Sequence, residues 1–84
     1  MHKNNCERIK SLLEDMFKQK NIQIEIKLID KYAKGMGFWR MRIKVDSRYL
    51  HLLDHIYSTA YSICALDGEY LDGKKIKRGF LYLS

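Results

Sequence analysis

Two stretches of the chain decide its fold: residues 22–28 read IQIEIKL, and residues 38–46 read FWRMRIKVD. In both, apolar side chains alternate with polar or charged ones at a period of two residues, which predicts strands with one buried face. We expect an antiparallel hairpin, with Gly35 and Gly37 as the flexible points of its loop. Aligning the two apolar faces places Leu28 opposite Trp39, Ile26 opposite Met41, Ile24 opposite Ile43, Glu25 opposite Arg42 and Lys27 opposite Arg40.

A helix is predicted before this hairpin, over residues 5–19, because the apolar period there is 3.6 residues. Asn4 and Glu7 have the spacing of a capping box at the start of this helix. At its end, Lys18 lies where the helix dipole favours a cation, and Asn21 is able to adopt the left-handed conformation that terminates helices. The apolar side chains that we expect to face the core are Ile9, Leu12, Leu13, Met16 and Phe17.

A second helix is predicted over residues 47–66, with Asp46 or Ser47 as its N-cap and the Asp-Gly pair at 67–68 as its stop. Residues 69–71, the Asp-Gly turn signal at 72–73 and a closing strand over residues 75–83 are expected to form a second hairpin. These elements predict an α+β fold in the order α-β-β-α-β-β. We expect a two-layer sandwich with an antiparallel sheet and both helices on one face. Without proline or a low-complexity linker, residues 1–84 are expected to form a single domain.

The chain is basic, with sixteen Lys and Arg against ten Asp and Glu and a formal net charge of +6 at pH 7. This balance favours anionic partners such as nucleic acid. No apolar stretch is long enough to span a membrane, and the first residues do not resemble a signal peptide. Two cysteines far apart in sequence make no disulfide framework, so we expect a cytoplasmic protein that does not act at a membrane.

Most of the positive charge falls in the hairpins, six cations in the first and four in the second, ten of the sixteen in the chain. Helices on one sheet face leave the other free to display them together with aromatic rings, an arrangement that suits stacking of unpaired bases. Phe80 and Tyr82 either join this face or belong to the core, with Leu81 and Leu83 turned outward. The alternative is that the charges only solvate the sheet. The residues predicted to bind nucleic acid or another partner are Lys31, Lys34, Phe38, Arg40, Arg42, Lys44, Lys74, Lys75, Lys77, Arg78 and Tyr82.

Three other patterns lack what their chemistry requires. Residues 34–37 read KGMG, without the Gly-Lys-Ser/Thr ending of a phosphate-binding loop or a helix after it. His51 and His55 have the spacing of a zinc pair, but no third ligand is specified. Antiparallel helices would bring Cys6 and Cys64 together, yet Cys64 lies on an apolar stripe and is interpreted as a core residue. We therefore predict no catalytic residue, metal ligand or cofactor.

These patterns favour a non-enzymatic binding protein that acts on nucleic acid, either RNA or single-stranded, or on a nucleoprotein. The alternative is a protein–protein inhibitor or adaptor, such as a phage or mobile-element accessory protein that blocks a host nucleic-acid enzyme. The wide, tyrosine-bearing stripe of the second helix also suits a homodimer or docking onto a host protein. A small nuclease would require His51 and His55 to converge with the hairpin cations, yet the predicted helix stripe and sheet face point in different directions.

Overall fold

The computed structural model describes residues 2–30, 39–69, 71 and 73–84, and it confirms the α+β fold and the order of its elements. The four strands form one antiparallel sheet in the order β1-β2-β4-β3. The elements are α1 (Lys3–Lys18), β1 (Ile24–Asp30), β2 (Trp39–Val45), the 3₁₀ helix η1 (Ser47–Leu52), α2 (Leu53–Leu66), β3 (Lys74–Lys77) and β4 (Phe80–Leu83).

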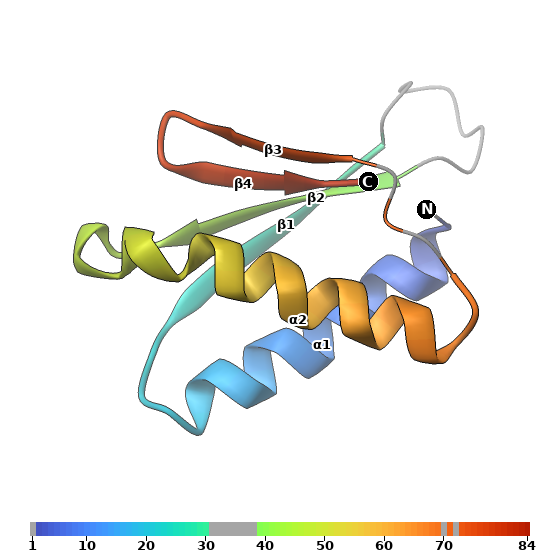
Figure 1. The fold of residues 1–84 in the computed structure, drawn as a ribbon, viewed down its shortest axis with the longest axis horizontal. Helices are drawn as coiled ribbons and strands as arrows, with labels where there is room; N and C mark the ends of the chain where they lie inside the picture. The colour runs from blue at the N-terminus through green and yellow to red at the C-terminus, as the bar shows by residue number, and fades with distance from the viewer. Residues whose placement is uncertain (1, 31–38, 70, 72) are drawn as a thin grey trace.

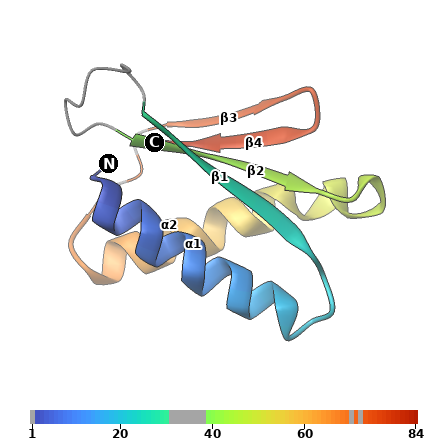
Figure 2. The same ribbon diagram turned by 180° about the vertical axis from the view of Figure 1, so that it is seen from behind.

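Both helices lie on one side of the sheet, side by side and antiparallel, as Figure 1 and the reverse view in Figure 2 show. The contacts between the helices agree with this antiparallel arrangement. The Phe17 ring near the end of α1 meets the His55 ring near the start of α2 edge-on, at 6.2 Å between centroids. At the opposite ends, Arg8 forms an ion pair with Asp67. Neither helix among the described residues is long and apolar enough to cross a membrane.

The core lies between the helices and the sheet and consists of one cluster of apolar side chains. Alternate residues of β1, β2 and β4 enter it, whereas all four residues of β3 are exposed. Ile43 and Leu81, which are cross-strand neighbours, are fully buried. From the helical layer, Ile9, Leu13 and Ile56 are also fully buried. We call the helix-facing side of the sheet the covered face.

The predicted register of the β1–β2 hairpin is wrong by two residues. Leu28 pairs with Met41 rather than Trp39, and Ile26 pairs with Ile43. A shift of two residues keeps every side chain on its face, so the apolar pattern of each strand fits both alignments equally well. The shift changes the charge pairs, because Lys27 now lies opposite Arg42, and Glu25 opposite Lys44.

The predicted capping box at the start of α1 is also wrong. The helix begins at Lys3 with His2 in an extended conformation, and the His2 side chain forms no capping hydrogen bond. Asn4 therefore lies inside the helix, and the amide of the neighbouring Asn5 donates a hydrogen bond to Glu69 instead. At the other end the prediction is confirmed, because Asn21 has a φ of 58°.

The predicted second helix begins as a 3₁₀ helix, η1, and continues as α2. The Asp46 carboxylate accepts a hydrogen bond from the Arg48 backbone N–H at 3.2 Å, which confirms Asp46 as the cap. Gly68 follows the helix with a φ of +73°, as its predicted stop requires.

The predicted closing strand over 75–83 is wrong, because a turn divides it into β3 and β4. The two turn residues, Arg78 and Gly79, have φ values of 54° and 80°. Positive φ at both positions is the geometry of a type I′ turn, whose twist matches that of the strands it joins. The hairpin turn therefore lies at 78–79 rather than at 72–73, and it places β4 in the interior of the sheet beside β2.

Candidate nucleic-acid interface

The side of the sheet opposite the helices carries most of the predicted site. In β2, Met41, Ile43 and Val45 are buried on the covered face, so the residues that alternate with them point the other way. These residues are Arg40, Arg42 and Lys44. None of the described helices packs on this side, as Figures 1 and 2 show.

Strand β4 adds two aromatic rings to the same side. Leu81 and Leu83 are fully buried, which settles the orientation that the sequence left open. Phe80 and Tyr82 consequently lie beside the β2 cations, since the cross-strand pairs are Lys44 with Phe80 and Arg42 with Tyr82. Both rings are half-buried.

The guanidinium groups of β2 lie against these rings. The Arg42 Cζ atom is 4.9 Å from the centroid of the Phe80 ring, and the Arg40 Cζ atom is 5.7 Å from that of Tyr82. The two ring centroids are 6.3 Å apart with an interplanar angle of 47°. Such cation–π contacts hold long arginine side chains down on the sheet surface and leave their charge available to a ligand.

The outer strands extend the positive surface on both sides. Lys75 and Lys77 of β3 lie opposite Tyr82 and Phe80, and Lys27 of β1 lies opposite Arg42. All three lysines are exposed. The open face is defined by the outward residues of all four strands, namely Glu25, Lys27, Ile29, Arg40, Arg42, Lys44, Lys75, Lys77, Phe80 and Tyr82. Glu25 is the single acidic residue in this described set.

The structure separates some predicted site residues from the open face. Lys74 points to the helical layer, where its Nζ atom is 2.5 Å from Asp54 Oδ1 and 4.8 Å from the centre of the Tyr57 ring. Arg78 lies in the exposed β3–β4 turn at one end of the face. The predicted residues Lys31, Lys34 and Phe38, and the loop glycines Gly35 and Gly37, lie outside the described residues.

Four residues of the open face were not among the residues predicted to bind, and two of them, Lys27 and Phe80, belong to its basic and aromatic surface. Lys27 is the polar member of an alternating strand, so the β1 pattern already indicated its outward position. For Phe80 the signal was its spacing of two from Tyr82, which places both rings on one face.

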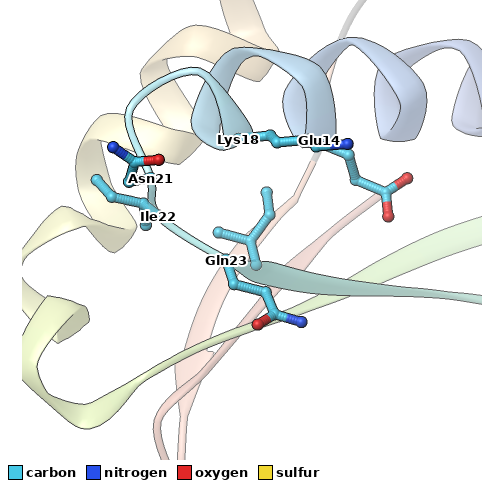
Figure 3. A pocket seen from close by; sticks show the side chains of 6 residues that line it. Glu14, Lys18, Asn21, Ile22 and Gln23 are labelled. Atoms are coloured by element: carbon cyan, nitrogen blue, oxygen red, sulfur yellow. The ribbon is translucent and has the colours of Figure 1, made fainter.

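Two larger hollows of the described surface mix charges of both signs. One, of about 450 Å³, lies between the last turns of α1 and the segment leading into β1, where Glu14 and Lys18 face Asn21, Ile22 and Gln23 (Figure 3). Another, of about 350 Å³, combines Glu25 and Asp46 with Lys44 and Arg48. The mixture of charges gives neither hollow a clear preference for an anion or a cation.

His51, His55, Cys6 and Cys64 lie in the helical segments. His51 on η1 and His55 on α2 are both exposed, and the His55 ring meets the Phe17 ring edge-on. The described residues contain no group of three His, Cys, Asp or Glu side chains placed to hold a metal. Cys6 and Cys64 are free thiols with no exposed surface. Burial raises the pKa of Cys6 to about 11 and also raises that of Cys64, which keeps both as unreactive thiols near neutral pH.

No protein-family model, curated protein or solved structure matches this chain. The functional interpretation therefore depends on the geometry and the charge of the open face.

Proposed function

We propose that the protein binds single-stranded nucleic acid on its open face and acts as a binding module rather than an enzyme. The observation that carries this proposal is the pairing of two guanidinium groups with two aromatic rings on a sheet surface that no described helix covers.

The charge of the open face supports a polyanionic ligand. Its outward lysines and arginines come from three of the four strands, β1, β2 and β3, so they form one field rather than isolated charges. A strand of nucleic acid crossing the sheet would place phosphates beside these cations and release condensed counterions, which makes the affinity depend steeply on salt.

The aromatic rings support a ligand with unpaired bases. Phe80 and Tyr82 lie side by side on the face, 6.3 Å apart, so each offers a separate position for one base. A base stacks either on a ring or on the planar guanidinium that covers it, with a free energy of about 1–3 kcal/mol per base. In a duplex the bases are stacked on one another and are not available to a flat sheet surface.

Other features favour binding without catalysis. His55, which would be an acid–base group in a nuclease, packs on Phe17 within the helical layer and on the other side of the sheet. The outward carboxylate of the described strands, Glu25, lies beside Lys44, and two strands, β2 and β4, separate it from the β3 lysines.

The first experiment measures fluorescence anisotropy of labelled single-stranded RNA and DNA of about twelve nucleotides, with duplexes of the same sequence as competitors. We expect single strands to bind more tightly than duplexes. If a strand engages about four cations, log K falls with log salt at a slope of about −3. Binding that does not change with salt, or a stronger preference for duplex, would contradict the proposal.

Two pairs of variants locate the surface. Tyr82→Leu is expected to weaken binding about tenfold, while Tyr61→Leu, at an exposed ring on α2, is expected to leave it unchanged. Lys44→Gln is expected to reduce both the affinity and the salt slope. Lys18→Gln makes the same charge change on α1 and is expected to leave both unchanged. Equal losses within each pair would place the binding surface away from the open face.

A further inference from the structure

A small hollow of about 230 Å³ opens on the open face between three strands. It is lined by Arg40 of β2, Lys75 and Lys77 of β3, and Tyr82 of β4. Lys75 is the cross-strand neighbour of Tyr82, and the Arg40 guanidinium lies over the same ring, so three cations surround one aromatic side chain.

The described part of the lining contains three cationic side chains and no carboxylate. The two larger hollows differ in this respect, since each has at least one acidic residue beside its basic ones. Three positive charges around a hollow of this size attract an anion with more than one negative charge.

Arg40 is held in the hollow by packing. Its Nε atom is buried, and among the described residues no acceptor forms a hydrogen bond with it. A buried donor without an acceptor lowers the stability of the fold. The position of the Arg40 Nε atom is therefore not explained by a contribution to the stability of the sheet. The contact with the Tyr82 ring fixes the guanidinium plane, and the fork of donors on that plane suits the oxygens of a phosphate.

We infer that this hollow binds the terminal phosphate of a single-stranded nucleic acid, so that the protein prefers phosphorylated strand ends. The inference rests on the proposed function, because the rest of the strand lies on the open face. A terminal phosphomonoester carries a charge of about −1.5 to −2 at pH 7 and three acceptor oxygens. An internal phosphodiester carries a single negative charge, which three cations exceed. The volume of about 230 Å³ leaves room for a phosphate group.

The test compares oligonucleotides of one sequence and about eight nucleotides that carry a 5′-phosphate, a 3′-phosphate or hydroxyls at both ends. We expect one phosphorylated form to bind about fivefold or more tightly than the hydroxyl form. This advantage should grow between about pH 5.5 and about pH 7.5, because the second proton of the phosphate leaves near pH 6. The two phosphorylated forms show which end of the strand occupies the hollow.

Variants distinguish a direct contact between the hollow and the terminal phosphate from the general positive charge of the open face. The double variant Lys75→Gln, Lys77→Gln is expected to lose the advantage of the phosphorylated end. The matched double variant Lys27→Gln, Lys44→Gln removes the same charge from the open face outside the hollow, and it should weaken all three oligonucleotides while keeping that advantage. All four lysines are exposed, so thermal unfolding should show both variants folded.

The outcomes distinguish the two proposals. Equal affinity for all three oligonucleotides, or an advantage that survives in the Lys75/Lys77 variant, would overturn the terminal-phosphate site and leave single-strand binding standing. Absence of binding to every oligonucleotide at low salt would overturn both.

Discussion

The covered face and the open face of the sheet use alternate residues of the same strands, yet they differ in nearly every property. Ile43 and Leu81 are neighbours with no exposed surface, while Arg42 and Tyr82, one residue away in each strand, form part of a basic and aromatic surface. Alternate positions along each of these strands therefore contribute to the stability of the core and to the chemistry of the surface. Folding depends on the covered face, and the open face is free to carry charges that contribute little to folding.

The largest expected difference between the faces is in stability. Ile43→Ala should lower the free energy of unfolding by about 2–5 kcal/mol, because it leaves a cavity in the core. Arg42→Ala, at the adjacent position, removes one cation–π contact and should cost less than about 1 kcal/mol. Urea denaturation followed by circular dichroism measures both. Similar losses for the two variants would mean that the open face is part of the folding core.

An intermediate effect is expected from the thiols on the covered side of the sheet. The pKa of Cys6 is raised to about 11 by burial, so the folded protein keeps the thiol protonated where the unfolded chain ionises it. The protonated Cys6 thiol makes its full contribution to stability below the pKa that it has in the unfolded chain. This contribution is lost as the pH rises through the pKa that it has in the folded protein. Between about pH 8.5 and 11, stability should fall by up to about 2 kcal/mol.

The double variant Cys6→Ala, Cys64→Ala is the control for this pH dependence, since lysines and tyrosines titrate in the same range. Urea denaturation at several pH values should show a shallower decline for the variant than for the unmodified protein. Identical slopes would show that neither thiol is linked to folding.

The smallest effect is expected on the open face and should have opposite signs for stability and binding. Lys27 lies opposite Arg42, a like-charge pair that folding does not favour. Lys27→Glu should raise the free energy of unfolding by about 0.2–1 kcal/mol and weaken oligonucleotide binding. Chemical denaturation and anisotropy on the same preparation measure both, with Lys27→Gln as an intermediate. A variant that gains in stability without losing affinity would show that β1 does not take part in binding.

The alternation of apolar residues in β1 and β2 was enough to predict which side chains occupy which face. It could not predict the register, because sliding Leu28 from Trp39 to Met41 moves the pair by two residues and preserves both faces. The apolar pattern is the same before and after such a shift. The difference appears only in the charge pairs, which contribute too little to select a register.

Two parts of the candidate site could not be derived from local pattern. The turn at 78–79 has Arg78 in a left-handed conformation, for which arginine has no particular preference, so the sequence resembled a continuous strand. In β4, apolar side chains occupy both faces, and only pairing with β2 decides that Tyr82 points outward. The contacts of Arg40 and Arg42 with the two rings depend on that pairing, which joins strands separated by the whole of α2.

The strand order β1-β2-β4-β3 has a consequence for synthesis of the protein on the ribosome. Strand β3 is made before β4 but has no neighbour in the sheet other than β4. The β1–β2 hairpin and β3 therefore stay unconnected until residues 80–83 have emerged from the exit tunnel. A nascent chain that stalls before that point has neither Phe80 nor Tyr82 in place, so the open face is complete only after β4 has been inserted beside β2.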